Sequence, residues 1–492
     1  MRQQDSDFIP VITERIEQIA GVLKNAGYNQ KNICRLLKTS EIPTYEEKKK
    51  ALPLFLYRTE NESAPEILVR LFLFKCSVSS KKFAEVIAPT SISDWCDAGL
   101  IFEKDSTVTA FVELIPFDEM IFAADWRENS LPEPVMGIAA SSKVLGRFCI
   151  KKNVNKTLDL GTGGGILSLI SAMHSKTVIG IDCNARAVEF ARFNAALNGI
   201  SNTEFLVGDW FAPIAENKFD LIVCNPPFMI APHGLPVHSV SGKRADELCR
   251  EIIRTVPEFL NESGFFQMVF NWIKHFGPDW RERLNDWLAE SPCDALLFIS
   301  HFESADEYAF QRSGEVSREK FESENLFRQW LEYVQSENIE SVGFGILTMR
   351  RRSGQGNWVR FEQLKGFDEK GASGENIQKL FDLTDISRTN DDTEFLNLSL
   401  RAAPQIKLSQ ELKNFSDGWA MNDFRAESFE GIKHSSEVTP QIFDFILKTD
   451  GKMSVGDYLK TIAGESFEIQ NPLIADFLKT VRRLLEEGIL IE

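Results

Sequence analysis

The sequence lacks several patterns that would place a protein in a familiar class at once. Its eight cysteines and six histidines form no CxxC, HxxxH or HxH spacing, which disfavours a zinc site or a disulfide framework. No run of about 18 apolar residues occurs, so no membrane-spanning helix is expected. The first residues contain no apolar signal core, and we therefore expect a cytoplasmic protein with reduced thiols.

Positive charge is also scarce. The chain has 55 Lys and Arg against 72 Asp and Glu, which gives a net charge of −17. A uniformly acidic surface repels phosphate, so contact with a nucleic acid would need a local basic patch. The composition thus favours a protein or small-molecule substrate and leaves RNA open. Hydrophobic and charged fractions of 43% and 26% are typical of globular proteins, and 492 residues predict about three domains.

One stretch, 157–228, contains the motifs that indicate a functional site. A short apolar strand over 157–160 runs into Asp-Leu-Gly-Thr-Gly-Gly-Gly, starting at Asp159, and a helix follows from about Ile166. Glycines are needed where backbone must come close to a ligand or take a positive φ. A glycine-rich turn between strand and helix predicts a site for a nucleotide-like cofactor.

The segments that follow strengthen this prediction. A second strand, 177–181, ends in Asp182, which lies 23 residues after Asp159 and would meet a ribose. A helix over 185–198 and a strand over 203–207 lead to Asp209 and Trp210. A strand over 220–224 then delivers the tetrad Asn225-Pro226-Pro227-Phe228 at its carboxyl end, where such sheets place their chemistry.

In this order the motifs resemble those of a class I S-adenosyl-L-methionine-dependent methyltransferase. They resemble in particular the group that methylates nitrogen on planar groups, which includes release-factor glutamine methyltransferases and enzymes of adenine N6 or guanine N2. The resemblance implies an α/β, Rossmann-like sheet of seven strands, the last inserted antiparallel, and S-adenosyl-L-methionine as cofactor. The cofactor-binding residues that it implies are Asp159, Gly161, Gly163, Gly165, Asp182 (ribose), Asp209 (adenine amino group), Trp210 and Asn225.

The tetrad suits a nitrogen whose lone pair is delocalised. The side-chain carbonyl of Asn225 and the backbone carbonyl of Pro226 could grip two N–H bonds and aim the lone pair. Pro227 restricts the turn, and Phe228 would lie against the planar group. The resemblance thus implies these four residues as catalytic. The alternative is that the tetrad is an ordinary turn after a strand.

The acceptor of the methyl group stays open at this point. We favour a protein glutamine amide, with an RNA or DNA base as the second hypothesis and a non-catalytic, cofactor-binding scaffold as the third. The helix within 135–148, with Ser141 and Ser142, either covers the methionine end of the cofactor or only packs there. It lacks the Pro-Arg start of release-factor enzymes. His233 is either a base or an ordinary loop histidine, and the basic run 350–352 either an RNA-phosphate contact or a solvated edge.

The flanks carry weaker signals. We predict an accessory domain over 1–130, the methyltransferase domain over 131–355 and a second accessory domain over 356–492. Helices over 65–74, 81–88 and 91–98 and a ribbon within 100–114 resemble a winged helix, and a similar helix–Gly–strand junction recurs at the C-terminal end. Because the helix over 91–98 carries Asp94 and Asp97 but no Lys or Arg, we expect it to dock protein rather than DNA. Segment 45–50 is predicted to be a charged connector, and segment 362–392 either a connector or a poorly ordered insertion.

Overall fold

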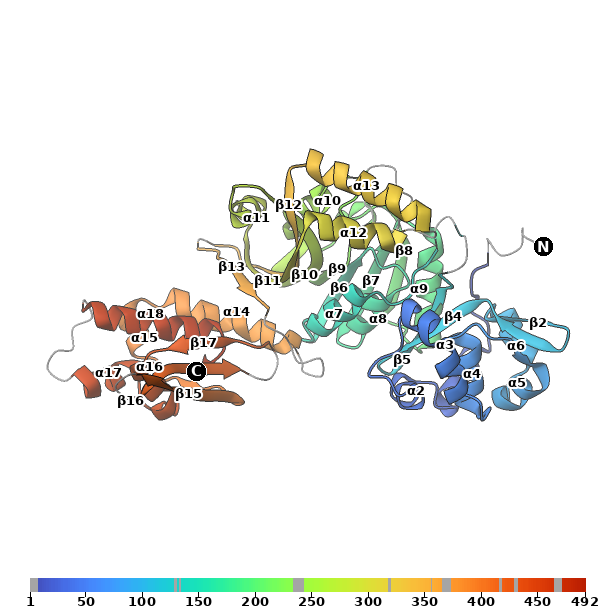
Figure 1. Cartoon of the computed structure of the whole chain (residues 1–492), viewed down its shortest axis with the longest axis horizontal. Helices are drawn as coiled ribbons and strands as arrows, with labels where there is room; N and C mark the ends of the chain where they lie inside the picture. The colour runs from blue at the N-terminus through green and yellow to red at the C-terminus, as the bar shows by residue number, and fades with distance from the viewer. Residues whose placement is uncertain are drawn as a thin grey trace. The chain divides into compact units, whose positions relative to one another are not determined.

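The computed structural model describes residues 8–127, 131, 134–232, 243–316, 320–354, 356–364, 373–415, 418–428, 432–463 and 471–492. They fall into two compact units (Figure 1). The first lies within 1–146, 153–297 and 302–360, and the second within 147–152, 298–301 and 361–492. The division into three domains at 130 and 355 remains a prediction.

An eight-stranded sheet is the largest element of the structure. Its strands are β6 (Val154–Leu160), β7 (Ser175–Asp182), β8 (Thr203–Val207), β9 (Phe219–Cys224), β10 (Leu260–His275), β11 (Cys293–Ser304), β12 (Ile339–Arg351) and β13 (Val359–Gln363). They lie in the order β13-β11-β12-β10-β9-β6-β7-β8. β6, β7, β8, β9 and β10 pair in parallel, and β12 pairs antiparallel with β10. The α/β fold and the antiparallel strand are confirmed, whereas the count of seven was wrong because β13 adds an edge strand beside β11.

Helices connect the strands of this sheet. They are α7 (Ala140–Phe148), α8 (Ile166–Ala172), α9 (Ala185–Leu197), α10 (Glu247–Thr255), α11 (Trp280–Leu288), α12 (Ala305–Val316) and α13 (Lys320–Ser336). α10 gives way at Val256 to a 3-10 turn that contains Pro257. Proline lacks the N–H that would continue the α-helix. α12 was not predicted, because its Phe310 is 68% exposed and interrupts the apolar period.

The N-terminal part of the first unit contains six helices and five strands among its described residues. They are α1 (Ile16–Asn25), α2 (Gln30–Leu37), α3 (Tyr45–Arg58), α4 (Ala64–Phe72), β1 (Val78–Ser79), α5 (Ser80–Ile87), α6 (Ile92–Asp97), β2 (Ile101–Lys104), β3 (Thr107–Ala110), β4 (Val112–Phe117) and β5 (Met120–Asp125). The three predicted helices are confirmed as α4, α5 and α6, and the ribbon as β2 and β3. Segment 45–50 is not a connector. It begins α3, because Thr44 and Glu47 form a capping box that satisfies the first backbone N–H groups.

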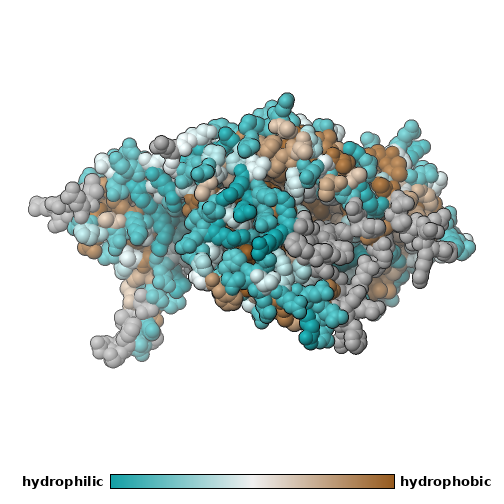
Figure 2. Space-filling model, turned by 90° about the horizontal axis from the view of Figure 1, so that it is seen from above, coloured by the Kyte–Doolittle hydropathy of each residue, from teal (hydrophilic) through white to brown (hydrophobic). Residues whose placement is uncertain are grey.

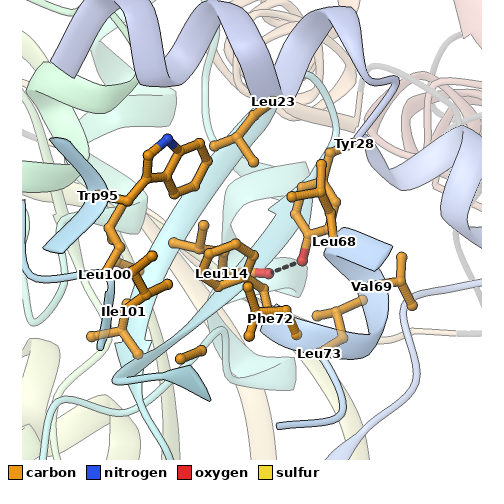
Figure 3. Packing of buried hydrophobic residues seen from close by; sticks show 14 of the residues in the cluster. Leu23, Tyr28, Leu68, Val69, Phe72, Leu73, Trp95, Leu100, Ile101 and Leu114 are labelled. Carbon is orange, nitrogen blue, oxygen red and sulfur yellow. Dashed lines mark hydrogen bonds between the residues drawn. The ribbon is translucent and has the colours of Figure 1, made fainter. Parts of the chain in front are cut away.

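The core of this part is apolar and rich in aromatic side chains (Figure 3). The fully buried Phe72 and Trp95 stack with ring centroids 5.8 Å apart, and the Tyr28 hydroxyl donates to the Leu114 carbonyl at 2.7 Å. The same core continues onto α9 through residues such as Phe190 and Phe193. The N-terminal elements and the sheet helices therefore share one apolar interior.

Two asparagines of α9 form hydrogen bonds with the backbone of β5. Asn194 accepts from the Ala123 N–H at 2.7 Å and donates to the Ala123 carbonyl at 3.1 Å. One helical turn later, Asn198 makes the same pair of bonds with Ile121, at 2.9 and 2.7 Å. The distance along a helix between residues four positions apart is thus close to the distance along a strand between residues two positions apart. The side chains of α9 therefore bond the edge of β5 at the positions where a neighbouring strand would bond it.

The second unit is mixed. Its elements are α14 (Ser373–Thr389), α15 (Asp392–Leu396), β14 (Arg401–Ala402), β15 (Ile406–Phe415), β16 (Gly418–Ser428), β17 (Ser435–Val438), α16 (Pro440–Lys448), α17 (Val455–Ala463), α18 (Pro472–Glu486) and β18 (Leu490–Ile491). The connector predicted over 362–392 is wrong from 373 onward. There α14 buries Ile377, Leu380 and Phe381, which have helical spacing but are separated by polar residues.

The surface is mainly hydrophilic on the face that Figure 2 draws. Hydrophobic residues form separate groups on that face. None of the helices in the described ranges is long and apolar enough to cross a membrane.

The boundary between α9 and β5 generates a stability prediction. Asn194 is fully buried, and Asn194→Ala leaves backbone groups of Ala123 without partners, at about 1–3 kcal/mol for each group. We expect Asn194→Ala to lower the free energy of unfolding of the first unit by about 2–4 kcal/mol in denaturant titrations. Asn198→Ala is the matched control, and because Asn198 is only partly buried its loss should be smaller. Equal losses would contradict this assignment.

Candidate functional site

The predicted motifs meet at one edge of the central sheet because the strands end in register. Leu160 of β6 pairs with Ile181 of β7 and with Cys224 of β9. Asp182 pairs with Val207 at the end of β8. The glycine turn, Asp182, Asp209 and Asn225 therefore all follow the carboxyl ends of neighbouring parallel strands.

The glycine turn is fixed by the neighbouring strand. The N–H groups of Gly161 and Thr162 both donate to the Ile181 carbonyl at 2.9 Å. Gly161, Gly163 and Gly165 have φ values of 72°, 53° and 87°, a region that favours glycine. A Cβ on Gly163 would meet no described atom within 4 Å, whereas one on Gly165 would lie 3.1 Å from the Ala191 Cβ of α9. Gly163 thus faces open space, and Gly165 makes room for a helix.

Asp159 lies buried beneath this turn. Its Oδ2 accepts hydrogen bonds from the hydroxyls of Thr162 at 2.7 Å and Ser168 at 2.8 Å. Its Oδ1 is buried without a hydrogen-bond partner among the described residues. Burial raises the pKa of the Asp159 carboxyl to about 6, although the two hydroxyl hydrogen bonds lower it.

Asp182 closes the turn from the next strand. Its Oδ2 accepts from the Gly163 N–H at 2.8 Å, and its Oδ1 from the Asn184 N–H at 2.9 Å. Each carboxylate oxygen can accept a second hydrogen bond, and the side chain is only partly buried. Asp182 therefore retains acceptor capacity for a ligand above Gly163.

Asn225 is held from one side only. Its Nδ2 donates to the hydroxyls of Ser141 at 3.0 Å and Ser142 at 2.8 Å, both on α7. Its Oδ1 is buried and has no hydrogen-bond partner within the described ranges. A buried acceptor without a partner costs free energy, so this oxygen marks a place where a donor is expected to bind.

The remaining predicted residues lie around these groups. Pro226 is buried, while Pro227 and Phe228 are partly buried directly after β9. Asp209 follows Gly208, whose N–H donates to the Asp182 carbonyl at 3.0 Å, and its side chain is exposed beside the partly buried Trp210. His233 lies outside the described residues.

Two features of the site were not predicted. The bonds of Ser141 and Ser142 to Asn225 were missed, because their position upstream of β6 had indicated the cofactor instead. Asn194 donates to the Gly164 carbonyl at 2.9 Å and so ties the glycine turn to α9. Its signal in the sequence was a polar side chain on the otherwise apolar face of a predicted helix.

The basic run 350–352 is buried or partly buried, and its side chains contact other parts of the protein. Arg350 pairs with the fully buried Asp294 at 2.7 Å, and Arg352 pairs with the same carboxylate at 3.2 Å. Arg351 donates to the Pro257 carbonyl. All three guanidinium groups have partners within the first unit.

Comparisons with known proteins match the same region. The model of the methyltransferase small domain matches residues 137–285. A release factor glutamine methyltransferase of Aliivibrio fischeri is 49% identical over 80 residues, or 16% of this chain and 28% of that protein. A candidate protein N5-glutamine methyltransferase of Methanocaldococcus jannaschii is 31% identical over 157 residues, or 30% of this chain and 79% of that protein.

Nucleic-acid enzymes are also among the relatives. Ribosomal RNA small subunit methyltransferase C of Alcanivorax borkumensis is 32% identical over 116 residues, or 24% of this chain and 32% of that protein. The chain spans only 28% and 26% of the release factor glutamine methyltransferases of Aliivibrio fischeri and Vibrio cholerae.

The sheet order, the glycine turn and the tetrad at the common strand edge agree with a methyltransferase domain of the class that the sequence motifs resemble. The chain belongs to the methyltransferase small-domain family. The residues present fit the cofactor of this class, since Gly163 faces open space, Asp182 retains acceptor capacity and two buried oxygens lack partners in the described structure.

The raised pKa of Asp159 predicts a pH dependence. A carboxyl whose folded-state pKa lies above its ordinary value binds a proton more tightly when folded, so stability falls as pH rises from about 4 to 6. The Asp159 proton contributes on the order of 2–3 kcal/mol to the free energy of unfolding at low pH, and this contribution is lost as pH rises. Asp159→Asn should abolish it, so unfolding titrations of both proteins from pH 4 to 8 should diverge within this window. Parallel curves would refute the assignment.

Proposed function

We propose that this protein is an S-adenosyl-L-methionine-dependent N-methyltransferase that acts on the side-chain amide of a protein glutamine. The observation that carries the proposal is the buried Oδ1 of Asn225, at the edge where the motifs meet, which has no hydrogen-bond partner among the described residues. An acceptor in that position suits a substrate that brings an N–H group.

The chain's own residues supply positioning. Asn225 Oδ1 and the Pro226 carbonyl each accept one N–H of the substrate amide, which turns the nitrogen lone pair out of conjugation and toward the site. Pro227 limits the turn, and Phe228 packs against the planar amide. When bound, the cofactor supplies a methyl group on a positively charged sulphur. The amide nitrogen, once methylated, releases one proton to solvent.

The cofactor is assigned to the groups around the glycine turn. Asp182 would accept hydrogen bonds from the ribose hydroxyls, and Asp209 from the adenine amino group, with Trp210 beside it. The turn Gly161–Gly165 would cradle the methionine part above Asp159. The positive φ values of its glycines and the open space at Gly163 support this arrangement.

Charge favours a protein acceptor. The net charge of −17 opposes a phosphate backbone, and the basic run 350–352 lies toward the amino end of β10, where Asp294 and the Pro257 carbonyl are its partners. The names of the glutamine methyltransferase relatives also support a protein acceptor. A nucleobase amine, as in the rRNA relative, is the second candidate, and a scaffold without turnover is disfavoured by the complete tetrad.

The cysteines and the N-terminal helices bear on where the protein works and how it meets its substrate. All eight cysteines are free thiols, which supports the cytoplasm as the location. The N-terminal helices and ribbon form a module for docking or positioning a protein substrate, since α6 presents Asp94 and Asp97.

The function is tested by its product. Lysate incubated with radiolabelled cofactor and the full chain should yield label that protease, and not nuclease, releases, and mass spectrometry should place the methyl group on a glutamine. RNA methylation that weakens steeply with added salt would replace the proposed acceptor by a nucleobase. Absence of any label would support the scaffold.

The cofactor assignment is tested at Asp182. Asp182→Ala should weaken binding of the cofactor at least tenfold in calorimetric titration, because two charge-assisted hydrogen bonds are lost. Asp220→Ala is the matched control, since Asp220 also accepts two backbone N–H bonds, at 2.8 and 3.1 Å, but at the opposite, amino end of the strands. It should lower stability and leave affinity intact. Unchanged affinity in Asp182→Ala would refute the assignment.

The tetrad is tested at Asn225. Asn225→Ala should slow single-turnover methyl transfer by about 10²–10³ while cofactor affinity changes little, because one preorganised hydrogen-bonding group is removed. Phe228→Tyr should be tolerated, whereas Phe228→Ala should weaken substrate placement. Unimpaired transfer by Asn225→Ala would mean that the tetrad is only a turn.

A further inference from the structure

The orientation of one amide decides whether the tetrad offers an acceptor or a donor. An asparagine side chain presents a carbonyl on one side and an NH₂ group on the other, and the two are nearly equal in shape. If the amide of Asn225 were turned over, its NH₂ group would face the N–H of a substrate amide. Two donors would then oppose each other, and the grip would be lost.

Ser141 and Ser142 hold the NH₂ end of this amide on the side of α7. The Asn225 Nδ2 has two hydrogens, and each is used by one hydroxyl, at 3.0 and 2.8 Å. These two contacts hold one end of the amide on the α7 side, and in this arrangement the other end, Oδ1, faces the opposite side. That atom is the buried acceptor without a partner in the described structure.

The two serines are themselves held in place. Ser142 is 9% exposed, and Leu145 one turn later is fully buried. A Cβ on Gly146 would come within 2.7 Å of Ile170 Cδ1, so α7 packs closely on α8. Lys143 pairs with Glu41 at 3.1 Å. These contacts anchor the helix on which both hydroxyls depend.

We propose that Ser141 and Ser142 are positioning residues that set the amide of Asn225 so that its carbonyl faces the methyl acceptor. This inference rests on the proposed function for its kinetic consequence but not for its structural one. The serines act through Asn225 and touch neither the substrate nor the reacting atoms. A direct role of the two hydroxyls in holding the cofactor is the alternative that the test must separate.

The first experiment needs no substrate. In the full chain labelled with ¹⁵N-asparagine, the two Nδ2 protons of Asn225, assigned by their loss in Asn225→Ala, should exchange slowly with solvent. In Ser141→Ala/Ser142→Ala they should exchange at least tenfold faster. Ser171→Ala on α8 is the matched control, because Ser171 is also buried but its hydroxyl has no hydrogen-bond partner among the described residues. Unchanged exchange in the double variant would overturn the proposal.

The second experiment separates positioning from cofactor binding. The double variant should slow single-turnover methyl transfer at least tenfold, with cofactor affinity within about twofold of the wild type. In an Asn225→Ala background the same two substitutions should change the rate less than twofold. Ser142→Thr, which keeps the hydroxyl, should restore most of the rate when combined with wild-type Ser141.

Each outcome decides the question. Equal rate losses in both backgrounds, or a parallel loss of cofactor affinity, would overturn the positioning role. If no glutamine is methylated at all, the proposed function fails, and the exchange measurement still tests the serines. If the double variant does not fold, Ser141→Ala alone is measured in the same exchange experiment.

Discussion

The parallel pairing of β6 with both β7 and β9 is the constraint on which the site depends. Leu160 is the shared point, since it lies opposite Ile181 on one side and Cys224 on the other. This single register brings the glycine turn, Asp182 and Asn225 to one edge of the sheet. β6, β7 and β9 each bury four consecutive residues, so both faces of these strands are covered. A slip by one residue would exchange the side chains that pack on the two faces, and the packing on both faces therefore enforces the register.

Much of this edge follows from sequence pattern. Short apolar runs that each end in Gly, Asp or Asn predict parallel strands with functional carboxyl ends, and the strand bounds agree within a few residues. The eighth strand, β13, had no such ending to mark it. Charged or polar residues dominate the segments 45–50 and 373–389, and that composition predicts connectors. In the structure a capping box at Thr44 and buried residues such as Phe381 form helices there.

The contacts within the site lie beyond sequence reasoning for a physical reason. Ser141 and Asn225 are 84 positions apart, and their hydrogen bond depends on how α7 packs against α8. The same holds for Asn194 and Gly164, or for the three arginines from 350 to 352, whose partners lie on other elements. Sequence pattern reports which face of an element is buried, but not which polar group meets it inside the fold.

The two asparagines of α9 have a consequence beyond stability. β5 pairs with β4 on one side, and a two-stranded ribbon of this kind would otherwise offer its other edge to any passing strand. Because Asn194 and Asn198 occupy the backbone groups of Ala123 and Ile121, that edge cannot template pairing with another chain. The side chains of α9 therefore protect this edge from aggregation without an additional strand.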